Sequence, residues 1–329
     1  HYGYHFDQAL VGRFFARKSA GVEIIDAVVA GVVRDAQTGD VTALELDNGQ
    51  TLNADFVIDA TGFRKQLIVK EMGAAWISYA HELPVNRALP FWIDIGKGEE
   101  IANYTRAWAL DSGWMWQTPT QTRYGCGYVY SDQFATPEQA KAEVEAALGR
   151  EIEVRADIRF DIGRLDKAWM GNVLAVGLSS SFLEPLESTS IHGTIVQMML
   201  FADRYLKDPS KITAAERDDY NARVGRQVDD FRTFINMHYL DTPFWREVRA
   251  NRIHPEARER LALWQTRMPR HEQFAENLFG LPHVQSQLYY PVLHGLGLLD
   301  QNLARREMEA DPRLRQFARA AYDGLVKEY

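Results

Sequence analysis

Short apolar runs bounded by turn residues dominate the first half of the chain and predict strands. Valine and isoleucine are frequent over residues 22–33, which favours a strand over a helix. The apolar run over 24–33 is interrupted by Asp26 and is about half the length of a membrane span, so we interpret it as a buried strand. Residues 41–46 and 50–52 flank Asp47-Asn48-Gly49, whose Asn-Gly step tolerates positive φ and predicts a hairpin.

Two further apolar runs predict buried strands, and the first ends in small residues, as expected for a strand whose end approaches a ligand. Residues 54–62 end in Thr61-Gly62, and residues 172–178 end in Gly177-Leu178. The second run leads through a short loop into a long apolar-periodic helix over about 191–206. This order of strand, loop and helix indicates a nucleotide-binding sheet, with Thr61, Gly62, Gly177 and Leu178 as the residues expected beside the cofactor.

The remaining periodicities complete an α/β pattern followed by a helical one. Aromatic and β-branched residues are dense over 89–130 and favour an antiparallel sheet. A short helix is expected over 7–18, and another over 137–148 with Thr136 as N-cap and Gly149 at its end. Beyond Pro209 the pattern is helical, with breaks near the prolines Pro243, Pro255, Pro269 and Pro282.

Composition excludes several classes of function. The 329 residues carry a net charge of -8 with no basic run, which argues against nucleic-acid binding. The single cysteine, Cys126, excludes an intramolecular disulfide and a multi-thiolate metal site, so no metal is expected and a cytoplasmic location is allowed. The chain opens at His1 without methionine and with no signal-peptide pattern, from which we expect a preceding segment to be missing.

The most informative segment lies between the second buried strand and the long helix. It reads Phe-Leu-Glu-Pro-Leu-Glu-Ser-Thr-Ser-Ile-His over residues 182–192. A loop that enters a helix N-terminus offers unpaired backbone N–H groups and a positive dipole end, which together bind anions. The alternative is structural, with Ser188 or Thr189 as a simple N-cap and Glu187 as a favourable charge beside the first turn.

This segment resembles the signature of the flavin-dependent tryptophan halogenases. A second mark, Trp114-Met115-Trp116-Gln117-Thr118-Pro119, resembles the family's Trp-x-Trp-x-Ile-Pro motif, with Thr118 in place of isoleucine. On a strand the two tryptophans face the same side, and they would equally suit a core. Weaker matches follow the family's order along nearly the whole chain, at residues 3–7, 59–63, 76–79, 125–130, 238–239 and 244–245.

The resemblance implies a role for five residues. Glu187 matches the active-site glutamate thought to orient the halogenating species or accept the proton lost from the ring. Thr189 and Ser190 match positions whose backbone N–H groups bind halide, although several tryptophan-specific members have glycine where Ser190 stands. Trp114 and Trp116 match the pair thought to separate flavin from substrate.

The resemblance also implies the fold and the reaction. We expect an α/β FAD-binding, monooxygenase-like module over residues 1–206 and a mostly helical substrate module over 207–329. In the family, reduced FAD diffuses from a flavin reductase, and with oxygen it oxidises a halide ion, chloride or bromide, to an agent that travels to a small aromatic substrate such as an indole or a phenol. A monomer and a homodimer are both open.

Two parts of the family pattern are absent from this sequence. No G-x-G-x-x-G loop follows a strand, and the catalytic lysine belongs to the expected missing segment, so the chain alone should be inactive. We assign that role to none of Lys65, Lys70 and Lys167, which are expected on solvated surfaces. The alternatives are a flavin-dependent monooxygenase of the same fold and a non-catalytic fragment that keeps the fold.

Overall fold

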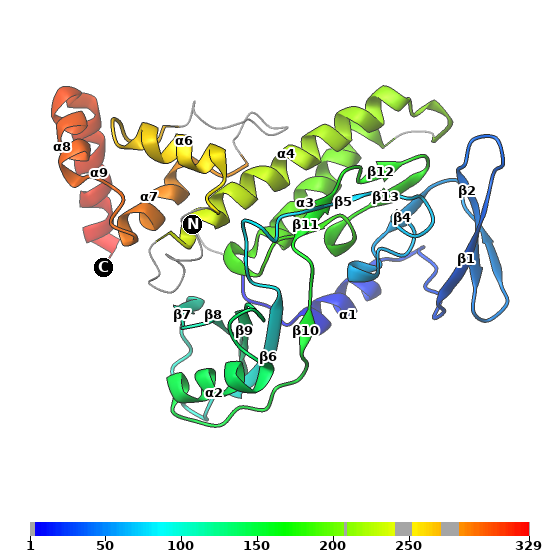
Figure 1. Ribbon diagram of the computed structural model, residues 1–329, viewed down its shortest axis with the longest axis horizontal. Helices are drawn as coiled ribbons and strands as arrows, with labels where there is room; N and C mark the ends of the chain where they lie inside the picture. The colour runs from blue at the N-terminus through cyan, green and yellow to red at the C-terminus, as the bar shows by residue number, and fades with distance from the viewer. Residues whose placement is uncertain (1–3, 207–208, 241–251, 271–282, 329) are drawn as a thin grey trace. The chain divides into compact units, whose positions relative to one another are not determined.

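Residues 4–206, 209–240, 252–270 and 283–328 are described by a computed structural model of the chain (Figure 1). Contacts divide the chain into two compact units, His1–Gly225 and Arg226–Tyr329. This division falls inside helix α4 (Ala214–His238), whereas the sequence places its module boundary at residue 206. Which ligand each unit holds stays a prediction.

The predicted hairpin is confirmed in a small antiparallel sheet of order β1-β2-β3. Its turn contains Gly49, whose φ of 83° lies in the left-handed region that glycine adopts without strain. The strands are β1 (Val29–Arg34), β2 (Val41–Leu46) and β3 (Thr51–Asn53).

The expected buried strand over residues 22–33 is only partly correct. Regular strand structure begins at Val29, and several of the preceding apolar side chains face solvent, with Val22 65% and Ile24 70% exposed. Valine and isoleucine fit a pleated, half-buried surface, but their presence does not say which surface will cover them. The interpretation of this stretch as buried is therefore wrong.

A five-stranded antiparallel sheet of order β10-β6-β9-β8-β7 confirms the second prediction. Helix α2 (Pro137–Leu148) covers one face, where Ala140 and Val144 share a buried cluster with Phe91 and Met115 (Figure 1). As predicted, Thr136 caps α2, and its hydroxyl accepts the Gln139 N–H. The strands are β6 (Arg87–Asp94), β7 (Arg106–Ala109), β8 (Gly113–Pro119), β9 (Arg123–Tyr130) and β10 (Ile158–Arg159).

The two further apolar runs, 54–62 and 172–178, lie side by side as parallel strands. In the sheet of order β12-β13-β4, Val57 of β4 (Val57–Asp59) pairs with Val173 of β13 (Val173–Ala175), and β12 (Trp169–Met170) pairs antiparallel with β13. All three residues of β13 are fully buried, as parallel sheets require. A neighbouring sheet consists of β14 (Ser181–Phe182), β11 (Gly163–Leu165) and β5 (Trp76–Ser78), in that order.

Helices flank these sheets in the first unit. Helix α1 (Gln8–Lys18) confirms the short helix expected over 7–18, and the carboxylate of its N-cap Asp7 accepts two backbone N–H groups. The long predicted helix is α3 (Thr189–Leu200), continued by the π-helical turn η4 (Phe201–Tyr205). The rings of Phe201 and Tyr205 both pack edge-on against Trp169. The 3₁₀ turns are η1 (Gly62–Arg64), η2 (Gly177–Ser179), η3 (Leu186–Ser188) and η5 (Pro209–Lys211).

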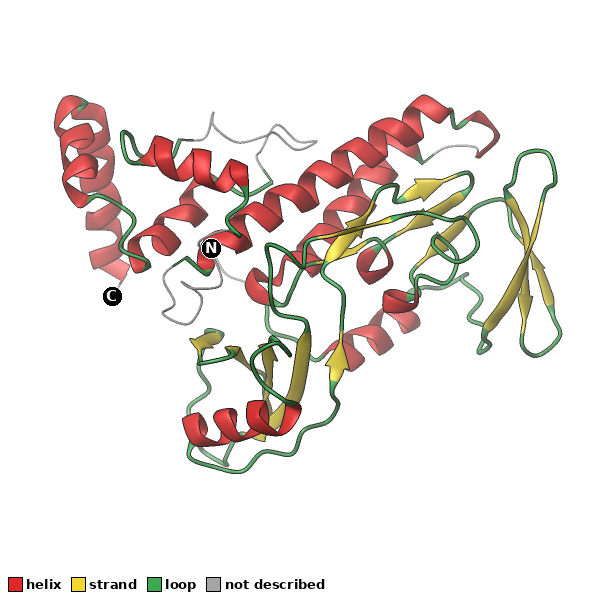
Figure 2. Cartoon of the chain, in the orientation of Figure 1, coloured by secondary structure: helices red, strands yellow, loops and turns green. Residues whose placement is uncertain are grey.

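The described part of the second unit consists of helices joined by turns and loops, with no strand, as predicted (Figure 2). Phe234 of α4, Trp264 and Tyr289 form a buried aromatic group, and Arg260 donates a 2.9 Å hydrogen bond to the hydroxyl of Tyr289. Pro243, Pro282 and the Phe244-Trp245 match lie outside the described residues. The other helices are α6 (Pro255–Trp264), α7 (Ser286–Gly295), α8 (Gln301–Ala310) and α9 (Pro312–Glu328).

Candidate functional site

The four residues predicted to adjoin a cofactor meet at the carboxyl ends of β4 and β13. Because Ala175 pairs with Asp59, the chain leaves both strands at the same edge of the sheet, where Thr61 and Gly62 lie opposite Gly177 and Leu178. Open α/β sheets bind ligands outside the carboxyl ends of their strands. The geometry therefore brings these four residues together where a ligand is expected.

Backbone conformation at this edge depends on glycine. Gly62 and Gly177 have φ values of 68° and 61°, which other residues adopt only with strain. A Cβ on Gly62 would meet no atom within 4 Å, so open space lies beside it. The Thr61 hydroxyl already donates to Asp59 and accepts the N–H of Gln66, so Thr61 would contact a ligand through its backbone.

Asp59 is the residue that organises this edge, and our sequence reasoning missed it. It is fully buried, and its carboxylate accepts hydrogen bonds from Ser179, from Thr61 and from the backbone N–H groups of Leu67 and Ile68. Burial raises the pKa of Asp59, but the hydrogen bonds outweigh burial and hold the pKa below its ordinary value. An acidic residue at the end of an apolar strand was the available signal.

The turn that carries Glu187 has an unusual backbone. Glu187 and Ser188 have φ values of 60° and 52°, two consecutive non-glycine residues in the left-handed region, and both side chains are exposed. Ser188 stands at the N-cap position of α3, but its side chain makes no capping hydrogen bond. Of the two residues considered as a structural N-cap, Ser188 thus occupies the cap position but does not cap the helix through its side chain. Strain of this kind persists where the surroundings hold it, and it is common at functional sites.

Thr189 and Ser190 form the first turn of α3, next to the cofactor edge. Thr189 is 6% exposed, and its buried hydroxyl oxygen has no hydrogen-bond partner among the described residues. The hydroxyl of Thr194 donates to the carbonyl of Ser190 and lies 3.5 Å from the position that a Cβ of Gly177 would occupy. The structure thus brings the predicted halide residues and the predicted cofactor residues into one region.

The two tryptophans of β8 lie on one face of the sheet, as predicted. Their ring centroids are 6.0 Å apart, with Trp114 buried and Trp116 half-buried. Gly127 of β9 lies opposite Trp116, and a Cβ there would fall 2.0 Å from the indole. Trp114 Nε1 donates a 3.3 Å hydrogen bond to Oε2 of Glu184, which connects this face to the turn that carries Glu187.

Of the three lysines expected on solvated surfaces, Lys65, Lys70 and Lys167, one is partly buried. Lys70 and Lys167 are exposed, whereas Lys65 is half-buried with its Nζ 4.0 Å from the ring centroid of Trp76. Desolvation lowers the pKa of Lys65, and the charge of Asp161 partly offsets this. The expectation is therefore wrong for Lys65, because a neighbouring indole covers its ammonium group.

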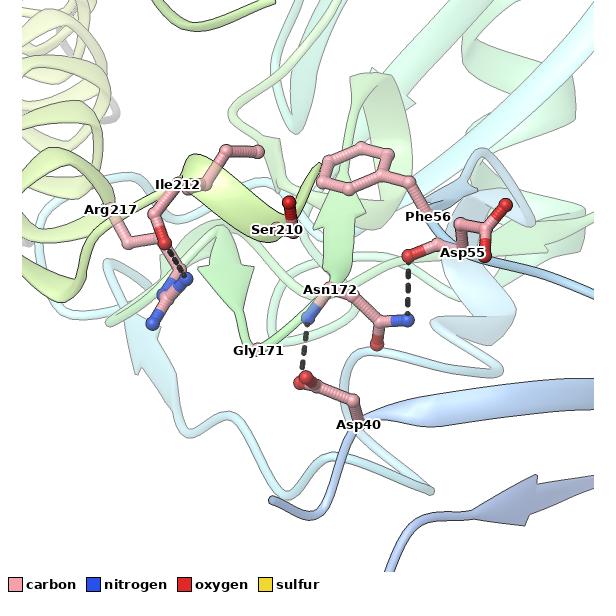
Figure 3. A pocket seen from close by; sticks show the side chains of 8 residues that line it. All are labelled: Asp40, Asp55, Phe56, Gly171, Asn172, Ser210, Ile212 and Arg217. Atoms are coloured by element: carbon pink, nitrogen blue, oxygen red, sulfur yellow. Dashed lines mark hydrogen bonds between the residues drawn. The ribbon is translucent and has the colours of Figure 1, made fainter. Parts of the chain in front are cut away.

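A separate cavity of about 240 Å³ lies near the opposite ends of the central strands (Figure 3). Asp55 and Phe56 precede β4, and Asn172 precedes β13. The Asn172 amide donates to the carbonyls of Val41 and Asp55, so its role is to join chain segments. Since ligands bind at the carboxyl ends of such strands, this cavity does not define the functional site.

No group of three or more histidine, cysteine, aspartate or glutamate side chains is arranged to hold a metal ion in the described parts of the chain. Among the helices that the structure describes, none is both long and apolar enough to span a bilayer.

Comparison with known proteins places this geometry in context. The model of the tryptophan halogenase family matches residues 1–311. Tryptophan 6-halogenase SttH of Streptomyces toxytricini is 31% identical over all of this chain and 65% of its own length. Tryptophan 7-halogenase RebH of Lentzea aerocolonigenes is 32% identical over 91% of this chain and 59% of its own length. The chain thus spans about two thirds or less of these curated relatives.

Solved structures agree with the sequence comparison. The crystal structure of SttH superposes with a TM-score of 0.81 and 29% identity, covering 97% of this chain and 65% of that one. BrvH, a flavin-dependent halogenase from Brevundimonas sp. BAL3, gives a TM-score of 0.78 and 29% identity over 95% of this chain and 66% of its own. The predicted α/β fold with a helical C-terminal part is confirmed.

Proposed function

The chain belongs to the tryptophan halogenase family, and from this premise we propose that it serves flavin-dependent halogenation of an electron-rich aromatic compound such as an indole or a phenol. One observation carries the proposal. The loops after β4 and β13, which are expected to hold the cofactor, come from distant parts of the sequence and meet at one end of the sheet. The first turn of α3, which is expected to hold the halide, lies beside them, because Thr194 donates to the Ser190 carbonyl and lies next to Gly177. Tryptophan, named in several relatives, is one member of the substrate class.

FAD is the cofactor that this edge would hold, through Thr61, Gly62, Gly177 and Leu178. Support comes from the two positive-φ glycines at the ends of adjacent parallel strands and from the open space beside Gly62. With oxygen, reduced FAD would supply the oxidising equivalents that turn a halide ion into an electrophilic halogen. The protein's part is to bind, to orient and to exclude water.

The halide would lie at the first turn of α3, held by the backbone N–H groups of Thr189 and Ser190. The first N–H groups of a helix have no intrahelical partner, and the helix dipole favours an anion there. The buried, unpartnered hydroxyl of Thr189 adds a donor close to these groups. Ser190 suits the role as well as glycine would, because the backbone supplies the contact.

Glu187 would act on the substrate, and the tryptophan pair would separate substrate from flavin. The Glu187 carboxylate is exposed at the strained turn, so it can accept the proton that an aromatic ring loses and stabilise positive charge on the ring. Trp114 and Trp116 offer a continuous aromatic wall on one face of β8. Such a wall keeps a second organic molecule from direct contact with the cofactor.

The expected partners are a small aromatic substrate and a flavin reductase that delivers reduced FAD by diffusion. A cytoplasmic location and the choice between monomer and homodimer stay predictions of the sequence. So does the assignment of residues 1–206 to the cofactor and 207–329 to the substrate.

Mass spectrometry of reaction products tests the proposal. The full-length protein is supplied with reduced FAD, oxygen, chloride or bromide, and a panel of indoles and phenols. A halogen isotope pattern on an aromatic product is the expected result. Hydroxylated products without halogen would instead identify a monooxygenase, and retained FAD without any product across the panel would favour the non-catalytic alternative.

A further inference from the structure

Glu184 is a buried acidic residue to which the proposed chemistry assigns no role. It lies three positions before Glu187 and is 0% exposed. Burying a carboxylate is costly unless hydrogen bonds or charges compensate. Its Oε2 accepts the indole N–H of Trp114 at 3.3 Å, a contact between residues 70 positions apart.

Trp114, the donor in this contact, is one of the two rings of the proposed aromatic wall. Trp114 is 7% exposed, and a buried indole N–H usually requires an acceptor. Its ring is tilted by 54° against that of Trp116 at a centroid distance of 6.0 Å. An acceptor that fixes the Trp114 ring therefore also fixes the surface against which the Trp116 ring packs.

The Glu184 side of the contact leads directly into the strained turn. Pro185 restricts φ after Glu184, and Glu187 and Ser188 then occupy the left-handed region before α3 begins. A strained turn keeps its conformation only where both ends are held. Thr189, buried at the start of α3, holds one end, and Glu184, buried against Trp114, holds the other.

We propose that Glu184 is a positioning residue that sets both the orientation of the Trp114 ring and the placement of the Glu187 carboxylate through its hydrogen bond to the indole of Trp114. This inference rests on the proposed function for the roles of Glu187 and the tryptophan pair. The hydrogen bond between Glu184 and Trp114 is observed in the structure and does not depend on that function. Glu184 touches neither halide nor substrate in this role, and it acts through the two groups that do.

The first measurement tests the hydrogen bond between Trp114 and Glu184. In FAD-loaded protein with ¹⁵N-labelled tryptophan, the indole N–H resonance of Trp114 is assigned by its loss in Trp114→Phe. We expect Glu184→Leu to shift this resonance upfield in the proton dimension and Glu184→Gln, which keeps an acceptor oxygen, to restore it. An unshifted resonance in folded Glu184→Leu protein would overturn the proposal, whether or not the protein halogenates.

The second measurement tests the effect on catalysis, as the amount of halogenated product formed per flavin oxidised. Because misplacement of about 1 Å is costly in catalysis, we expect Glu184→Leu and Trp114→Phe each to lower this ratio about 10-fold. The double variant should fall no further than the lower single variant, since both remove one contact. Glu184→Gln should stay within about 2-fold of wild type, because it preserves the acceptor.

A matched control separates positioning from general damage to the sheet. Trp92→Phe changes a 46% exposed tryptophan of β6 in the same sheet, and it should leave the product ratio unchanged. Multiplicative losses in the Glu184/Trp114 double variant would refute a shared contact. A wild-type protein that forms no halogenated product refutes the proposed function alone, and the Trp114 resonance still decides the role of Glu184.

Discussion

The hydroxyl of Ser179 donates a 3.2 Å hydrogen bond to the carboxylate of Asp59, 120 positions earlier in the chain. The same hydroxyl lies 3.2 Å from the carbonyl of Gly62. Asp59 ends β4 and Ser179 ends the turn after β13, so this contact fastens together the two loops that are proposed to hold FAD. The cofactor edge is held by a buried carboxylate as well as by the strand pairing.

Replacing Asp59 by asparagine should destabilise the fold. The amide has only one acceptor oxygen, and its NH₂ group would face backbone donors, so buried N–H groups lose their partners. We expect the free energy of unfolding to fall by about 2–4 kcal/mol in urea titrations. Ser179→Ala removes a single donor and should cost about 1 kcal/mol. Equal losses in the two variants would contradict the central position of Asp59.

The stability contributed by Asp59 should depend on pH in the acid range. Its pKa is depressed in the folded protein, so the unfolded chain binds a proton more readily, and acid favours unfolding. The contribution is complete above the ordinary value of 3.8 and is lost as pH falls through it toward the lower folded pKa. The free energy of unfolding should therefore fall more steeply with decreasing pH between about pH 5 and 2 for wild type than for Asp59→Asn.

Glycine at position 188 should stabilise the strained turn. A side chain at φ 52° carries a steric penalty that glycine lacks, while glycine gains entropy in the unfolded chain. The balance predicts a gain of about 0.5–1 kcal/mol for Ser188→Gly in thermal unfolding. Ser188→Ala keeps the Cβ and should change stability little, since Ser188 makes no capping bond. If Ser188→Ala stabilised the protein as much as Ser188→Gly, relief of backbone strain could not explain the gain.

Glu187→Gln should suppress halogenation while FAD binding persists. The amide keeps the shape of the side chain but cannot accept a proton from the ring, so we expect product formation to fall by about 10²–10⁴-fold. Flavin retention, measured by absorbance after gel filtration, should match wild type. Undiminished product in this variant would remove Glu187 from the proposed chemistry.

A methyl group at position 127 should displace the aromatic wall. The Cβ of Gly127→Ala would lie 2.0 Å from the Trp116 ring, so the indole must move, at a cost of about 1–3 kcal/mol in stability. We expect more flavin oxidation per halogenated product. Gly125→Ala on the same strand is the control, because its nearest neighbour would be 3.9 Å away. Similar behaviour of the two variants would count against the barrier role.

Much of the fold could be predicted because local signals and tertiary structure agree. Thr136 and Gly149 marked both ends of α2, and the Asn48-Gly49 step marked the hairpin, since each acts within a few residues. The stretch before Val29 could not be placed correctly from its composition. Its apolar side chains carry no information about whether another segment covers them, and burial is a property of the whole fold.

The candidate site was predictable in its residue types but not in its connections. A strand that ends in Thr61-Gly62 and a loop that enters α3 could be recognised along the chain. The hydrogen bonds of Asp59 and Glu184 reach across 120 and 70 positions, and no local pattern encodes such contacts. The left-handed backbone at Glu187 and Ser188 was equally hidden, because neither residue type normally adopts it.

The parallel pairing of β4 with β13 has a consequence for the order of folding. Val57 pairs with Val173, and all five strands of the β10-β6-β9-β8-β7 sheet lie in the chain between them. Local hairpins close quickly, whereas pairing two strands this far apart in the sequence first requires closure of a long loop, which costs conformational entropy. We therefore expect the cofactor edge to assemble late, so that substitutions in the intervening sheet reduce the yield of refolded, FAD-competent protein more than the activity of each molecule that folds.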